Sequence, residues 1–279
     1  MGHDVFMDTH HRAVADTGLL VAAVRARESA RADRLFADPF ADRLAGERGR
    51  ELLAAALASS GEQSVAQIVV RTRYWDEALL RAAAEVKQVV ILAAGMDARG
   101  YRLPWPDGTV VYELDQPEVL SVKGDLLAEE TPRCRRVAVP ADLVDNWAAA
   151  IRSAGLDPDA PTLWLLEGLL QYLDESAVEA LFDGISSLSA PGSVLLYEVV
   201  GKTLLESPMM ATVLESMARN GAPWLFGTDE PERLTESRGW TATVTDIAEP
   251  GNRYGRWFAP AVPLDVPGVP RGYFVTATR

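Results

Sequence analysis

The stretch Gln88–Arg99, which reads QVVILAAGMDAR, decides the fold. It begins with the apolar run Val89–Leu92, in which three of the four residues are β-branched. An unbroken apolar run is typical of a strand buried on both faces, as in a parallel sheet covered by helices. The small residues that follow, Ala93, Ala94 and Gly95, allow a ligand to approach the backbone where open α/β sheets bind ligands. Taken alone, the run also fits an ordinary core strand.

A second predicted strand, 109–115 (TVVYELD), ends in two acids. Glu113 and Asp115 lie two residues apart, so they face the same side of an extended chain. They follow Gly95 by about 20 residues, the interval at which nucleotide-binding α/β domains place a carboxylate for ribose hydroxyls. No G-x-G-x-x-G phosphate loop can be written here, because Ala93 occupies the place of a first glycine. The pattern predicts a nucleoside ligand without phosphates, and S-adenosylmethionine fits that description.

Strands and helices alternate along most of the chain. The segments 162–166 and 193–200 predict further buried strands, and their spacing is typical of parallel βαβ units. Near the end, 241–247 and 272–278 alternate apolar and polar residues, which predicts an antiparallel pair at the sheet edge. The chain is therefore expected to be α/β, with a mostly parallel twisted sheet. The remaining predicted elements are a strand at 134–140 and helices at 17–32, 40–44, 50–58, 64–86, 117–123, 146–154 and 169–188.

Two segments outside this alternation predict a helical cap. Residues 1–60 precede the sheet, and an insertion at about 201–227 follows the fifth strand, so we expect residues 61–279 to form the main domain. The insertion contains Met209, Met210 and Trp224. Apolar residues at helical spacing usually belong to a hydrophobic core. Next to the end of a strand they can also cover a substrate-binding site. We take these three and Tyr172 as candidate substrate contacts.

Composition excludes several classes of protein. The chain has 279 residues, a net charge of -13 and a sequence pI near 4.7, which disfavours binding to nucleic acid. Its one cysteine, Cys134, allows neither an internal disulfide nor a cysteine zinc site, and we expect it to be incidental despite basic neighbours. His3, His10 and His11 lie in a terminus expected to be flexible, and no metal site is predicted. Without a signal peptide or a long apolar stretch, a cytoplasmic protein without membrane contact is expected.

The ordered motifs along the chain resemble the leucine carboxyl methyltransferase family, especially its actinobacterial branch of S-adenosylmethionine-dependent and polyketide-tailoring methyltransferases. The resemblance covers most of the chain and implies a Rossmann-like methyltransferase fold. The motifs that carry it are VAAVRARES, DPFA, RTRYWDE at 71–77, VVILAAGMDARGYRLPWP at 89–106, YELDQPEVL at 112–120, PADL at 140–143, LLEGLLQYL at 165–173, APGSVLLYEVV at 190–200 and GYFVTATR at 272–279.

The resemblance also implies site residues. Arg71 would hold the methionine carboxylate of the cofactor, for which its planar fork is suited, and Gly95 would lie beneath the methionine moiety. Asp115 would bind the ribose hydroxyls, Asp142 and Leu143 would bracket the adenine, and Glu167 would face the ammonium group.

Four residues bear on these assigned roles: Arg71 and Arg73 through helix geometry, and Ala93 and Ala98 as departures from the family pattern. Arg71 and Arg73 lie two apart on a predicted helix and cannot share a face, so only one should point into the site. The family usually has glycine where this chain has Ala93, and threonine where it has Ala98. An alanine at 93 is tolerated if its φ is negative. Ala93 and Glu113 remain among the candidate cofactor-binding residues.

The expected function is S-adenosylmethionine-dependent O-methylation, with a carboxylate of a small, polyketide-like or other secondary-metabolite molecule as acceptor. Methyl transfer from a sulfonium needs in-line positioning, and a carboxylate is ionised near pH 7, so no obligatory general base is predicted. A phenolic hydroxyl with Glu113, Glu167, Tyr172 or the His10–His11 pair as base is an alternative. A protein C-terminal carboxylate, the acceptor of the family's eukaryotic members, and a non-catalytic cofactor-binding protein also remain open. The sequence does not indicate an oligomeric state.

Overall fold

The computed structural model describes residues 9–279, with side chains from residue 16 onward. His3 and the side chains of His10 and His11 therefore lie outside the described part of the chain. Seven strands form one sheet in the order β3-β2-β1-β4-β5-β7-β6. The first five strands are parallel to one another, and β7 runs antiparallel to both β5 and β6. The predicted α/β class, mostly parallel with an antiparallel edge pair, is confirmed.

The strands lie within about one residue of their predicted bounds. They are β1 Gln88–Leu92, β2 Val110–Asp115, β3 Arg135–Pro140, β4 Thr162–Leu166, β5 Val194–Val200, β6 Thr241–Asp246 and β7 Gly272–Thr278. The helices of the described residues are α1 Thr9–Ser29, α2 Ala41–Ser60, α3 Gln63–Ala82, α4 Arg99–Arg102, α5 Pro117–Leu126, α6 Trp147–Ser153, η1 Leu170–Tyr172, α7 Glu175–Ser187, α8 Lys202–Leu205, α9 Ala211–Arg219, α10 Arg233–Glu236 and α11 Ala248–Arg253.

Four predicted helices differ from the observed ones. The first begins at Thr9 rather than at residue 17, so part of the terminus expected to be flexible is helical. The segments 40–44 and 50–58 form the single element α2, which kinks at Gly46 because its φ is 59°. The segment 169–188 divides into η1 and α7, because the Asp174 side chain accepts from Ala177 N at 2.8 Å and starts a new helix.

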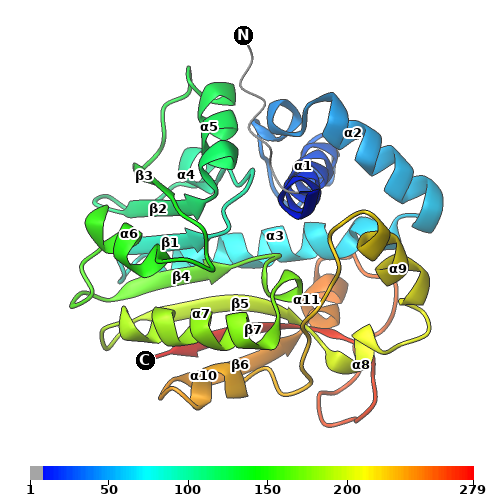
Figure 1. Ribbon diagram of the computed structural model, residues 1–279. Helices are drawn as coiled ribbons and strands as arrows, with labels where there is room; N and C mark the ends of the chain where they lie inside the picture. Colours follow the sequence, from blue (N-terminus) through cyan, green and yellow to red (C-terminus); the bar gives the residue numbers. More distant parts are fainter. Residues whose placement is uncertain (1–8) are drawn as a thin grey trace.

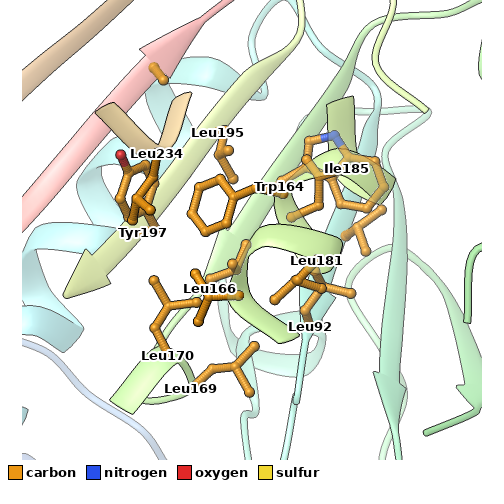
Figure 2. Packing of buried hydrophobic residues seen from close by; sticks show 14 of the residues in the cluster. Leu92, Trp164, Leu166, Leu169, Leu170, Leu181, Ile185, Leu195, Tyr197 and Leu234 are labelled. Carbon is orange, nitrogen blue, oxygen red and sulfur yellow. The ribbon is translucent and has the colours of Figure 1, made fainter. Parts of the chain in front are cut away.

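The central strands bury both faces, as their apolar runs predict. Val90 and Leu92 of β1 face the cluster under α6 and α7, whereas Val89 and Ile91 face the cluster under α3. Figure 2 shows the first cluster, in which Trp164 of β4 lies among side chains of β5 and α7. Two covered faces fix the register of the strands, because a slip of one residue would exchange every side chain between the two clusters.

A third apolar cluster joins α1 and α2 to the loop that follows β1. Ala22 and Val24 of α1 pack there with Leu44 of α2 and with Met96 and Tyr101. In Figure 1 these two helices lie together beyond the carboxyl ends of the parallel strands, and α8 and α9 of the 201–227 segment lie on the same side of the sheet. No helix in residues 9–279 has the length and apolar character needed to cross a membrane.

Candidate active site

The carboxyl end of β1 turns sharply and meets the end of β2. Gly95, with a φ of 47°, donates its backbone N–H to Asp115 Oδ2 at 2.6 Å, and Gln116 N donates to Asp115 Oδ1 at 2.7 Å. The positive φ explains why a glycine stands at this position. The structure thus brings together Gly95 and Asp115, which the sequence analysis placed in the same site.

Asp115 is a carboxylate with acceptor capacity left over. Each of its oxygens takes one backbone N–H and keeps a second lone pair for another donor. Burial raises the pKa of Asp115, while the N–H groups of Gly95 and Gln116 oppose that rise. A half-buried acceptor of this kind suits the neutral hydroxyls of a ribose.

The end of β3 lies beside this carboxylate. Asp142 accepts from Gln116 Nε2 at 2.8 Å and from Val144 N at 2.9 Å. Leu143 is half-buried and packs against the cluster under α6 and α7. Gln116 therefore connects the ends of β2 and β3, and Asp142 and Leu143 form the next part of the same edge.

Arg71 reaches the ends of β4 and β5 from α3. Its Nε lies 3.0 Å from Glu167 Oε1, and its Nη1 donates to Glu198 Oε1 at 2.7 Å. Burial lowers the pKa of Arg71, but the carboxylates of Glu198 and Glu167 more than offset this, so the pKa is raised. Gly168, with φ at 66°, lies against the guanidinium, where a Cβ would come within 3.3 Å of Nη2. The positive φ favours glycine at this position, and a Cβ there would crowd the guanidinium of Arg71.

Arg99 continues this ion network beneath the loop after β1. Its Nη1 lies 2.7 Å from Glu167 Oε2 and also contacts Asp97, while its Nε lies 2.8 Å from Asp76 Oδ1. Glu167 is thus held between Arg71 and Arg99. Burial alone would raise the pKa of Asp97, but Arg99 and other nearby cations lower it to about 2. The guanidinium of Arg99 thus holds Asp97, Asp76 and Glu167 in fixed positions.

Arg73 points elsewhere, as the helical spacing predicts. Its Nη1 donates to Leu35 O at 2.9 Å, and its Nη2 lies 2.7 Å from Glu77. Its side chain is 40% exposed, against 9% for Arg71. The two arginines therefore lie on different faces of α3, and only Arg71 reaches the strand ends.

Glu113 is not available to a ligand, contrary to the sequence prediction. It is fully buried, and its Oε2 lies 2.8 Å from Lys123 Nζ and 2.7 Å from Arg136. The alternation of side chains gives the face of a strand but not the depth along it. Glu113 lies two residues inside the sheet, beneath α4 and α5, whereas Asp115 is the last residue of β2. Glu113 is part of a buried ion cluster.

The backbone conformation of Ala93 differs from the one that the sequence analysis requires for an alanine. Ala93 has a φ of 50°, not a negative φ, and is the one non-glycine residue with positive φ among residues 9–279.

Burial raises the pKa of Cys134 to about 12, although its basic neighbours act in the opposite direction. The arginines around Cys134 therefore do not activate its thiol, in line with an incidental cysteine.

Helix α1 covers the loop after β1. Arg25 donates through Nη2 to Met96 O at 2.5 Å and through Nε to Asp38 Oδ2 at 2.9 Å. Gly18, two turns earlier on the same face of the helix, also lies against this loop, since a Cβ there would be 4.0 Å from Met96 N. The loop that carries Gly95 is thus held from outside by the N-terminal helix.

The candidate substrate residues are divided between two places. Leu225 N donates to Gln171 O at 2.6 Å, so the end of the 201–227 segment lies beside η1, which contains Tyr172. Trp224 is half-buried there, and its Nε1 has no hydrogen-bond partner among the described residues. Met209 is 76% exposed, and Met210 precedes α9. Tyr172 and Trp224 therefore lie near the strand ends, whereas Met209 lies on the surface.

Sequence reasoning missed Glu198, Gly168, Arg99 and Arg25. Glu198 carried a local signal, because it lies near the end of β5 much as Glu167 follows the end of β4. The pairing of the arginines with their carboxylates has no local signal in the sequence, because residues such as Arg71 and Glu198 are 127 positions apart in the chain.

The net charge of this edge fits S-adenosylmethionine. Connected ion pairs hold five carboxylates against four guanidiniums, and Asp115 and Asp142 lie outside these pairs, so the carboxylates at this edge outnumber the guanidiniums by three. The cofactor carries an ammonium, a sulfonium and a carboxylate, and so one net positive charge. Asp115 and Asp142 add acceptors for hydroxyl and amino groups. The carboxylates are Asp38, Asp76, Asp97, Glu167 and Glu198, and the guanidiniums are those of Arg25, Arg71, Arg99 and Arg102.

Comparison with known proteins matches the chain to one family. The leucine carboxyl methyltransferase family model matches residues 18–186, which include Arg71, Gly95, Asp115 and Glu167. A protein of Mycobacterium sp. (strain KMS) named "Putative S-adenosyl-L-methionine-dependent methyltransferase" is 43% identical, over 95% of this chain and 93% of its own. A protein of the same name from Mycobacteroides abscessus is 39% identical over 95% of both chains.

Solved structures agree on the fold. A structure described as a "putative methyltransferase" from Thermobifida fusca matches 94% of both chains with a TM-score of 0.63 at 18% identity. A DUF574 family protein from Streptomyces avermitilis matches 92% of this chain and 96% of its own, with a TM-score of 0.60 at 14% identity. With the family model and the relatives, this assigns the chain to the leucine carboxyl methyltransferase family, as a methyltransferase whose cofactor is S-adenosyl-L-methionine.

Proposed function

We propose that this methyltransferase acts on an oxygen of a small molecule, and that this oxygen belongs to a carboxylate. The observation that carries the proposal is that arginines hold the acids Glu167 and Asp97 at the strand ends. Arg99 and other nearby cations lower the pKa of Asp97, so this acid is a weak proton acceptor, and both oxygens of Glu167 already face guanidiniums. An acceptor that is ionised beforehand suits such a site. A polyketide-like or other secondary-metabolite carboxylic acid is the substrate class that we propose.

In this proposal the cofactor lies across the ends of β1, β2, β3 and β4. Asp115 accepts from the ribose hydroxyls, and Asp142 with Leu143 brackets the adenine. Gly95 lies beneath the methionine moiety. When bound, S-adenosyl-L-methionine supplies a methyl group activated on a sulfonium.

Arg71 and Glu167 hold the amino-acid end of the cofactor in this arrangement. The guanidinium of Arg71 is already fixed by Glu167 and Glu198, so its direction is set before a ligand arrives. Such preorganisation reduces the entropy lost on binding. Arg71 then pairs with the carboxylate of the methionine moiety, and Glu167 faces its ammonium group.

The acceptor side is formed by η1 and the end of the 201–227 segment. Tyr172 and Trp224 offer apolar ring surface near the strand ends, with polar atoms that can orient an acceptor. Positioning two reactants in line is the main task in a direct displacement. We propose that these two side chains, rather than the exposed Met209, contact the acceptor.

A hydroxyl acceptor is the second candidate, and Glu198 is the observation that favours it. Burial raises the pKa of Glu198, with Arg71 acting in the opposite direction, and its Oε2 has no hydrogen-bond partner among the described residues. A carboxylate with a raised pKa is better suited to take a proton from a phenol.

One labelling experiment distinguishes the two acceptors. The protein is incubated with methyl-labelled S-adenosylmethionine and either the small-molecule or the protein fraction of a cell extract, and the products are then treated with alkali. A methyl ester of a carboxylate is hydrolysed and releases volatile label, whereas a methyl ether keeps its label. We expect alkali-labile label in the small-molecule fraction. Alkali-stable label, or label found only on protein, would contradict the proposal.

A further inference from the structure

Helix α9 and its N-cap Met210 carry an apolar stripe. Met210, Val213, Leu214 and Met217 recur at intervals of three and four residues, so they lie along one side of the helix. All four side chains are half-buried, whereas most residues on the other sides of the helix, such as Glu215, are exposed. The stripe is therefore turned toward the body of the protein.

The stripe faces the protein without joining its core. No residue of α9 is buried, and among the described residues none in 202–221 belongs to the three apolar clusters of the fold. Apolar surface that stays in contact with water lacks the stabilisation that burial gives. A stripe that faces inward and is only partly covered is therefore suited to an apolar ligand that completes its burial.

The segment that contains α8 and α9 is fixed at its two ends. At the first end, Thr203 Oγ1 donates to Asp229 at 2.7 Å, and at the second, Leu225 N donates to Gln171 O at 2.6 Å. Among the described residues, the hydrogen bonds and ion pairs of 206–220 are made within the segment itself. Helix α9 can therefore move against the body of the protein without breaking a polar contact.

The stripe leads to the acceptor side of the site, which η1 and the end of the 201–227 segment form. Met217 O accepts from Ala222 N at 3.0 Å, and the chain then reaches η1 through the bond from Leu225 to Gln171. Figure 1 shows α9 on the side of the sheet where the parallel strands end. Met217 is thus the end of the stripe that adjoins the acceptor side, and Met210 lies about 10 Å further along the helix.

We propose that the apolar stripe of α9 binds the apolar body of the acceptor, and that the acceptor is a carboxylic acid with an extended hydrocarbon chain. This inference rests on the proposed function. The carboxylate lies at the acceptor side, and the chain runs along the stripe from Met217 toward Met210. Methionine side chains are flexible and adapt to chains of irregular shape.

The charges of the segment favour a small molecule over a membrane surface as the occupant of the stripe. Helices that lie on membranes are rich in lysine and arginine on their polar side. Here Lys202 is paired with Glu206, and Arg219 with Glu215, so α8, α9 and the turn between them have no excess of positive charge.

The test compares hexanoate and decanoate as probes of the full-length protein saturated with S-adenosylhomocysteine, with calorimetry as the readout. Each methylene removed from water increases affinity by about fourfold, so we expect decanoate to bind at least tenfold more tightly than hexanoate. No binding, or equal binding of the two acids, would overturn the proposal. Because S-adenosylhomocysteine cannot donate a methyl group, the result does not depend on which oxygen is methylated.

Matched variants locate the probe on α9. Met217→Gln keeps the length of the side chain and makes it polar, and should weaken decanoate binding at least fivefold with unchanged affinity for S-adenosylhomocysteine. Glu215→Gln changes a side chain that is 70% exposed on the same helix, and should bind decanoate as the unmodified protein does. Unchanged binding by Met217→Gln, or an equal loss in both variants, would refute this location.

Two further measurements separate this proposal from its alternatives. Sedimentation of the protein with phosphatidylglycerol vesicles in a manner that depends on Met217, without binding of decanoate, would assign the stripe to a membrane surface and overturn the proposal. With methyl-labelled S-adenosylmethionine, we expect alkali-labile label on decanoate. Binding of decanoate that depends on Met217, but without transfer of label, would support the apolar site and contradict the carboxylate acceptor of the proposed function.

Discussion

Replacing Arg71 by alanine removes the cation between the ends of β4 and β5. Arg71 lies 3.0 Å from Glu167 and 2.7 Å from Glu198, and none of the three side chains is more than 12% exposed. Deleting one partner of a buried ion pair costs about 3–5 kcal/mol, because the other charge stays buried without its partner. At about 2–4 °C per kcal/mol in a large domain, the melting temperature should fall by about 6–20 °C.

Arg73→Ala is the matched control on the same helix. Arg73 pairs with Glu77, and both side chains are at least one third exposed. Solvent screening reduces such a pair to about 0–1 kcal/mol, so a small change in melting temperature is expected. Calorimetric titration with S-adenosylhomocysteine, at a temperature where both variants are folded, should show a much larger loss of affinity for Arg71→Ala.

A double variant tests the physical reason for the loss. If an unpaired Glu198 causes most of the destabilisation, Glu198→Gln should recover part of the stability lost in Arg71→Gln, since no uncompensated charge then remains at this pair. The measurement is the free energy of unfolding of both single variants and of the double variant. Equal losses for Arg71→Ala and Arg73→Ala, or a double variant whose loss equals the sum of the single losses, would refute the reasoning.

Three further variants test the ends of β1 and β2. Ala93→Gly should raise the free energy of unfolding by about 0.5–1 kcal/mol. A φ of 50° costs alanine about 1–2 kcal/mol, and the greater conformational freedom of glycine in the unfolded chain offsets only part of that cost. A variant that is less stable in chemical denaturation would contradict this. Asp115→Ala should weaken S-adenosylhomocysteine binding by about 1.5–3 kcal/mol in calorimetry, and unchanged affinity would contradict its assigned role. The pKa of Asp97 falls from 3.8 to about 2 on folding, so its carboxylate contributes about 2 kcal/mol above pH ~4, and this is lost as the pH falls toward 2. Asp97→Asn should therefore destabilise the protein more at pH 6 than at pH 3, and an equal loss at both values would be inconsistent with that shift.

The strands could be predicted from the sequence because their signals are local. The run Val89–Leu92 is apolar throughout and is followed by small residues. The bounds of the strand and its burial on both faces can therefore be predicted from the local amino-acid sequence. The same locality placed Gly95 beside Asp115, since the ends of parallel strands meet at one edge of a sheet. The family resemblance then supplied roles that spacing alone does not give.

The remainder of the site depends on contacts between distant parts of the chain. The pairing of Arg71 with Glu198 joins α3 to β5, and no periodicity in the sequence reports it. Glu113 was placed wrongly because alternation along a strand gives the face of a side chain and not its depth beneath α4 and α5. The φ of Ala93 depends on how β1 leaves the sheet, which its side chain alone does not indicate.

A crystal structure of the protein with S-adenosylhomocysteine tests the central claim most directly. The account predicts that the ribose hydroxyls lie within about 2.5–3.2 Å of the Asp115 carboxylate, with the amino-acid end of the ligand beside Arg71 and Glu167. A ligand bound away from the ends of β1 and β2, or a ribose that makes no contact with Asp115, would contradict it.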